Sequence, residues 1–149
     1  METPGYFRPV RRVVTGTDGA GRSCVVSDTP SARIAVDPQY VLEDLWSMGL
    51  PAAVDGDPDV PARAGGAIAA GTILWRTCTI PAGEEIGAHA TDTVDCLTVL
   101  SGRLTLVLEA EEVTLERGDC VVQRNTRHGW RNLGPEPCVL IAAMASTVA

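Results

Sequence analysis

Histidine is scarce in this chain: His89 and His128 are the only two among 149 residues. Each lies in a glycine-punctuated stretch of strand-like residues, which indicates that the two imidazoles serve one site. Imidazole binds metals and exchanges protons near neutral pH. Asp95, six residues after His89, could add a carboxylate. Two imidazoles and one carboxylate can hold a divalent metal and leave positions open for water or substrate.

The side-chain alternation of a strand places these residues on common faces. His89 shares its face with Thr91, and His128 shares its face with Trp130, because residues two apart in a strand point the same way. Asp95 alternates in the same manner with Leu97 and Val99, which have the character of barrel-interior residues. A barrel brings distant strands around one interior. The sequence therefore predicts that His89, Asp95 and His128 converge.

Short strands separated by turns predict an all-β, antiparallel sandwich or barrel. Residues 40–48 fit either a helix turn or an irregular strand. Residues 49–71 are rich in Pro, Gly, Ala and Asp and predict a long surface loop, either functional or a simple insertion. The remaining expected strands are 10–15, 23–27, 32–36, 72–80, 95–100, 103–108, 113–115, 120–123, 129–132 and 138–143.

The composition restricts the class of protein. A length of 149 residues is most simply one domain. The net charge of −7 argues against nucleic acid or an anionic membrane as partner. All twelve basic residues are arginine, which excludes lysine chemistry such as a Schiff base.

The cysteines and the apolar segments indicate the compartment. The five cysteines are scattered and form no C-x-x-C pair, so we expect buried thiols in a reducing, cytoplasmic protein. We expect no signal peptide and no membrane span, because no apolar run is long enough.

The stretch from Gly83 to Gly102 resembles the first sequence motif of the cupin family. That motif has a glycine, five residues, H-x-H, three or four residues, a glutamate, six residues and a glycine. Here His89 is the first histidine, Thr91 replaces the second, and Asp95 replaces the glutamate.

The stretch from Gly118 to Asn132 is similar to the second cupin motif, although it is one residue shorter. His128 is its histidine, Gln123 stands where proline is common, and Asn125 stands near the usual turn glycine. The resemblance covers about residues 72–143. It implies a single-domain cupin, a jelly-roll barrel with a metal in its mouth, in which strands of residues 8–48 pack outside or across a homodimer interface.

The resemblance leaves the metal and the role of each group open. Nitrogen and oxygen ligands would suit one divalent ion, Fe, Zn, Mn, Ni or Co, held by His89, Asp95 and His128. Asp is shorter than Glu, so Asp95 could instead act through water or as a catalytic base. The histidines could also be acid/base groups of a metal-free site, in which case His128 would be catalytic. They could instead be structural residues.

Further residues are candidates for the wall that binds a small-molecule substrate. Thr91, Gln123 and Trp130 belong to this set, although Trp130 could equally be an ordinary core residue. Arg76 would anchor a substrate carboxylate or enolate if it pointed inward. We expect it to point outward into solvent.

Three functions fit these residues. The first is a metal-dependent lyase or isomerase that acts on a small organic acid or polyketide-like intermediate by proton abstraction and elimination, as a dehydratase, decarboxylase or isomerase would. The second is an Fe(II) dioxygenase that uses the same ligands. The third is a non-catalytic cupin that binds a small molecule. Metal content would separate them.

Overall fold

The computed structural model describes residues 2–30, 34–50 and 68–147. No helix among these residues is long and apolar enough to span a membrane. The described residues form the strands β1 (Val13–Thr17), β2 (Ser23–Asp28), β3 (Ile34–Asp37), β4 (Tyr40–Gly49), β5 (Thr72–Ile80), β6 (Glu85–His89), β7 (Thr93–Ser101), β8 (Arg103–Leu108), β9 (Glu112–Glu116), β10 (Cys120–Arg124), β11 (His128–Arg131) and β12 (Cys138–Ser146).

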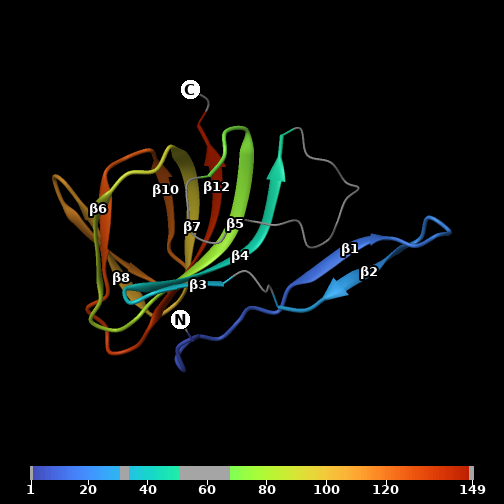
Figure 1. Cartoon of the computed structure of the whole chain (residues 1–149). Coiled ribbons are helices and arrows are strands. Elements are labelled where there is room, and N and C mark those ends of the chain that lie inside the picture. The colour runs from blue at the N-terminus through green and yellow to red at the C-terminus, as the bar shows by residue number, and fades with distance from the viewer. Residues whose placement is uncertain (1, 31–33, 51–67, 148–149) are drawn as a thin grey trace.

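Two antiparallel sheets form the jelly-roll barrel (Figure 1). The larger sheet has the order β10-β7-β12-β5-β4-β3, and the smaller has the order β6-β11-β8-β9. Neighbours in the sheets are distant in the chain, as in the β12–β5 and β11–β6 pairs. This pairing of distant strands arranges β6, β7, β10 and β11 around one interior. These four strands carry candidate site residues.

The core fills the space between the two sheets. Val99 and Leu140 of the larger sheet pack in one cluster with Leu104, Leu106 and Trp130 of the smaller. Alternating leucines on β8 supply the inward face, as the period-2 pattern predicted. The strands expected at 72–80 and 103–108 coincide with β5 and β8.

The N-terminal region divides into two parts. β1 and β2 form a separate hairpin that projects away from the barrel (Figure 1). Strands of residues 8–48 were expected outside the barrel or across a homodimer interface; the first placement is wrong for β3 and β4, which extend the larger sheet next to β5. Both faces of β4 are buried, as Val41 and Asp44 show, which is possible for a strand inside a sheet that is covered on each side.

The chain that precedes β1 covers the outer face of β4. The Val10 amide donates to the Glu43 carboxylate at 3.0 Å, and the Arg12 guanidinium donates to the Leu45 carbonyl at 3.1 Å. Glu43 and Leu45 are accordingly buried although they alternate with residues that face the interior. This part of the N-terminal region therefore packs on the outside of the sheet.

β4 resolves the ambiguity at residues 40–48. These residues form an irregular strand, in which the register shifts between Asp44 and Trp46. A bulge of this kind bends the strand and redirects its side chains. The loop expected at 49–71 begins where the Leu50 amide donates to the Gly71 carbonyl at 2.8 Å. Residues 51–67 of that predicted loop lie outside the described residues.

Candidate functional site

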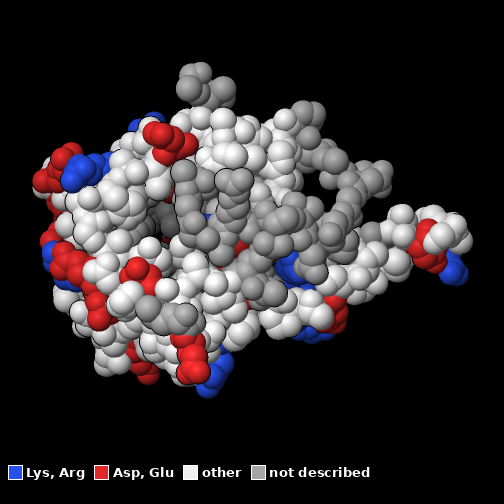
Figure 2. All heavy atoms as spheres, in the orientation of Figure 1, with Lys and Arg blue, Asp and Glu red and all other residues white. Residues whose placement is uncertain are grey.

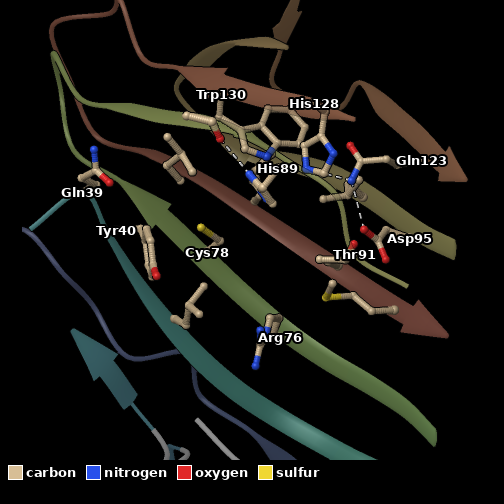
Figure 3. A pocket seen from close by; sticks show the side chains of 17 residues that line it. Gln39, Tyr40, Arg76, Cys78, His89, Thr91, Asp95, Gln123, His128 and Trp130 are labelled. Atoms are coloured by element: carbon tan, nitrogen blue, oxygen red, sulfur yellow. Dashed lines mark hydrogen bonds between the residues drawn. The ribbon is translucent and has the colours of Figure 1, made fainter. Parts of the chain in front are cut away.

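A cavity of about 460 Å³ lies inside the barrel between the two sheets. The smaller sheet contributes His89, His128 and Trp130, and the larger contributes Asp95 and Gln123. Figure 3 shows these side chains gathered at one part of the cavity wall. The volume is in the range of small-molecule sites. His89, Asp95 and His128 all line this cavity.

The two histidines lie side by side on neighbouring strands. His89 and His128 are register partners in β6 and β11, and their ring centroids are 4.3 Å apart. Trp130 presents its ring to His128 in an edge arrangement at 5.6 Å. Trp130 is therefore a cavity residue as well as a member of the core.

Backbone carbonyls fix the tautomer of each ring. His89 Nδ1 lies 2.9 Å from Gly87 O, and His128 Nδ1 lies 2.8 Å from Thr126 O. A carbonyl can only accept, so each Nδ1 carries the hydrogen and each Nε2 of the neutral ring keeps a lone pair. This orientation through a backbone carbonyl is the one that metal-ligating histidines commonly have.

Burial keeps His128 neutral. The side chain is 3% exposed. Desolvation lowers the pKa of His128 below its ordinary value of 6.5, and the neighbouring His89 lowers this pKa further, while Thr126 and Asp95 oppose the shift. At neutral pH this imidazole is consequently a lone-pair donor rather than an acid.

Gln123 connects the histidine to the carboxylate. Its amide nitrogen donates to Asp95 Oδ2 at 3.1 Å and lies 3.0 Å from His128 Nε2, which accepts the second hydrogen (Figure 3). The bond joins β10 of the larger sheet to β11 of the smaller. Two buried oxygens, Asp95 Oδ1 and Gln123 Oε1, have no hydrogen-bond partner among the described residues. Unpartnered buried acceptors are costly unless a ligand, ion or proton satisfies them.

The three-residue metal set expected from the sequence is not assembled. Among the described residues no group of three or more His, Cys, Asp or Glu side chains is placed to hold a metal ion. The physical reason is that Gln123 stands between Asp95 and His128. A reduced donor set nevertheless suits a divalent cation: His89 Nε2, His128 Nε2 once the Gln123 amide turns away from it, and two buried oxygens without partners.

Arg76 points into the barrel, so the expectation that it is solvated is wrong. It is 8% exposed and lines the cavity from β5. Its Nε donates to Asp44 Oδ1 at 2.7 Å, and Asp44 is fully buried on β4. The inward position is possible because a carboxylate on the neighbouring strand balances the charge.

Sequence reasoning missed several cavity residues. Asp44 could have been noticed as a carboxylate inside the apolar run of residues 40–48. Gln39, Tyr40 and Cys78 also line the cavity, and Gln39 donates to the Glu85 carbonyl on the opposite sheet at 2.7 Å. No motif indicated these three residues. Thr91 lies in the wall as expected, and its hydroxyl accepts from Thr93 Oγ1 at 2.8 Å.

Charged side chains of both signs are interspersed over the face shown in Figure 2. Arg131 pairs with Glu85 at 3.2 Å and with Glu112 at 3.1 Å. These are exposed pairs that join β11 to β6 and to β9. Exposed ion pairs of this kind contribute little to the stability of the fold.

The chain is similar to proteins of fungal biosynthetic gene clusters. It is 43% identical over 63 residues to the phomopsin biosynthesis cluster proteins C' and D of Diaporthe leptostromiformis, which covers 42% of this chain and 33% of each relative. It is 51% identical over 45 residues to the oryzines biosynthesis cluster protein J of Aspergillus oryzae, which covers 30% of this chain and 25% of that relative. The matched stretch spans a third or less of these relatives.

Solved structures share the fold. The cupin domain of Schizosaccharomyces pombe Cnp3 matches with a TM-score of 0.59 and 14% identity over 95% of this chain and 90% of that one. A cupin 2 conserved barrel domain protein from Salinispora arenicola matches with a TM-score of 0.55 and 19% identity over 78% and 83%. Residues 76–144, which contain every site residue predicted from the sequence, match the family model of the cupin domain. The described barrel therefore has the cupin fold, and its residues 76–144 carry the match to the cupin domain.

Proposed function

We propose that the cavity is the active site of a biosynthetic enzyme that moves a proton on a small organic acid or polyketide-like intermediate. The reaction class would be dehydration, decarboxylation or isomerisation. The similarity to biosynthesis cluster proteins supports a role in specialised metabolism. The buried polar groups that face an otherwise largely apolar cavity support catalysis.

The arrangement of Asp95 and Gln123 carries this proposal. Asp95 is 2% exposed, and the Gln123 amide fixes its Oδ2 while Oδ1 has no partner. A carboxylate oxygen that is held in place, desolvated and uncommitted is suited to accept a proton from a substrate carbon. Gln123 thus positions the base, and Asp95 Oδ1 receives the proton.

A divalent cation would be held by His89 Nε2 and His128 Nε2, with Gln123 Oε1 as the oxygen donor once the Gln123 amide turns over. When bound, such a cation polarises a carbonyl oxygen and stabilises the negative charge that develops on it. The protein's own groups supply the remaining parts. The carbonyls of Gly87 and Thr126 accept from Nδ1 and so leave Nε2 of each neutral ring as the lone-pair donor. Trp130 with Leu97 restricts water near the reacting carbon.

One observation favours a second candidate, a metal-free cupin that only binds its ligand. The two amide hydrogens of Gln123 already satisfy His128 Nε2 and one oxygen of Asp95. His128 Nε2 and Asp95 Oδ2 are therefore already engaged without a cation. This alternative predicts stabilisation by ligand without turnover.

Metal content measured by elemental mass spectrometry tests the proposal. We expect about one equivalent of metal per chain after reconstitution, and its loss in His89→Ala and in His128→Ala. The control is Cys96→Ser with Cys120→Ser, which removes two exposed thiols outside the cavity and should retain the metal. Metal that persists in the double histidine variant would contradict the assignment.

Proton transfer is tested separately by deuterium exchange. Phenylpyruvate in D2O should lose its C3 hydrogens faster with the protein than without it, as followed by proton NMR. Asp95→Asn should reduce the protein-dependent rate by about a hundredfold or more. Exchange at an undiminished rate in this variant would remove Asp95 as the base.

A further inference from the structure

Arg76 lies where two cavities meet. The second cavity measures about 360 Å³, and Arg76, Thr91 and Met144 line both it and the first. Asp92 and Thr93 contribute to the second one only. A molecule in either cavity can therefore contact Arg76.

The guanidinium is held from one side. Nε and Nη2 both lie 2.7 Å from a single oxygen of Asp44, and Nη2 is buried without a hydrogen bond of good geometry. A guanidinium carries five N–H donors in a planar fork. One oxygen of Asp44 engages only one edge of this fork. Donors remain for a second acceptor on the cavity side, where Figure 3 shows Arg76 on the same sheet as Cys78.

We propose that Arg76, oriented by Asp44, binds the carboxylate of the substrate. The inference rests on the proposed function and deepens it, because it selects the organic acid over a neutral intermediate. It also sets a direction. The acid group lies at the junction of the two cavities, and the reacting carbon lies toward Asp95 and the histidines.

The charges inside the barrel favour a monocarboxylate over a dianion. Asp44 and Asp95 are both buried. A phosphate or dicarboxylate would bring two further negative charges close to these carboxylates and would be repelled by them. A single carboxylate adds only one negative charge and can still accept two hydrogen bonds from the guanidinium. Leu97, Leu140 and Trp130 offer an apolar wall for an unsaturated or aliphatic body.

The test compares acids with their own amides. The probes are cinnamate with cinnamamide and hexanoate with hexanamide, and calorimetry gives the Kd of each. Wild type should bind at least one acid about tenfold more tightly than its amide. Arg124→Gln, which removes an exposed arginine of β10, should keep this ratio. Arg76→Gln should bring it to about one.

Arg76→Gln leaves the Asp44 carboxylate without this partner and could fail to fold. The double variant Arg76→Gln/Asp44→Asn removes both charges together and is the second measure. It should also lose the preference for acids, while Asp44→Asn alone should keep it. A preference for acids that survives in the folded double variant would overturn the inference, and so would a wild type that prefers no acid to its amide.

The binding ratio separates this inference from the proposed function. It requires neither turnover nor metal, because it is read with unreactive probes on chelated protein. If the acid-to-amide binding ratio is as expected but proton exchange is absent, the proposed enzyme function is wrong and the carboxylate site at Arg76 stands. If proton exchange is as expected but the ratio is one, the enzyme function stands and the carboxylate site is wrong.

Discussion

His89 and His128 are register partners on β6 and β11, and the carbonyl two residues earlier holds each ring. The pairing depends on an extra residue in β6, because His128 faces His89 while Trp130 faces Ile86. Such bulges redirect side chains next to active sites. Gly129 permits this one, since a Cβ there would lie 2.9 Å from the Ile86 carbonyl.

Acid should destabilise the metal-free protein through His128. Its pKa is lowered in the folded chain by burial, whereas the unfolded chain keeps the ordinary value of 6.5. Between these two values the unfolded state binds more protons, so stability falls as the pH falls through this window. The melting temperature of wild type should therefore approach that of His128→Gln between pH 7.5 and pH 5. A gap that is constant or widens would contradict the shift.

The same shift can be read directly by NMR. In His89→Gln only one histidine remains, so its Cε1–H resonance needs no further assignment. We expect its titration midpoint below 6.5, whereas the peptide unfolded in urea should titrate near 6.5.

Gly102→Ala should destabilise the barrel more than Gly83→Ala. Both glycines have a left-handed backbone, with φ of 77° and 80°. A Cβ at Gly83 would meet open space, but at Gly102 it would lie 2.8 Å from the Pro137 carbonyl. The left-handed conformation alone costs about 1–2 kcal/mol, and the clash adds to it. Urea unfolding should give about 1–2 kcal/mol for Gly83→Ala and a clearly larger loss for Gly102→Ala; equal losses would remove the clash from the explanation.

The thiols should fall into two reactivity classes. Cys96 and Cys120 are exposed, whereas burial raises the pKa of Cys78 to about 12 and that of Cys138 to about 11. The thiolate is the reactive form. In a Cys24→Ser background at pH 8, a disulfide reagent should label two thiols quickly and the other two only after unfolding. Adding Cys96→Ser and Cys120→Ser should abolish the fast phase. A fast phase that persists would show that the cavity thiol is accessible.

The sequence predicted the barrel because its strands alternate regularly and its turns carry glycine. Gly102 and Asn125 adopt positive φ where the motifs required a turn residue. The N-terminal strands were harder to place. β4 is buried on both faces, so neither its alternation nor its apolar run reveals whether it lies in the barrel sheet or outside it.

The sequence predicted those site residues whose direction follows from side-chain alternation along a strand alone. This alternation placed His89, Asp95, His128 and Trp130 in one cavity, where the structure has them. It could not show that Gln123 would stand between Asp95 and His128, because that contact depends on the packing of two sheets. The inward position of Arg76 depends likewise on Asp44, which reaches it only through the pairing of β4 with β5.

Metal and carboxylate should strengthen each other's binding. The charge of Arg76 is balanced by Asp44, so Asp95 leaves a formal charge of −1 among the charged side chains that face the main cavity. A divalent ion at the histidines would change this sum to +1. At an effective dielectric constant of about 20, two unit charges roughly 8 Å apart interact by about 2 kcal/mol, and a divalent ion with a carboxylate by about twice that before screening by salt. Zinc-loaded protein should consequently bind cinnamate about tenfold or more tightly than chelated protein, with cinnamamide unchanged. By reciprocity cinnamate should raise zinc affinity by the same factor. The effect should vanish in His89→Ala/His128→Ala, and equal cinnamate affinity with and without zinc in wild type would separate the carboxylate site from the metal site.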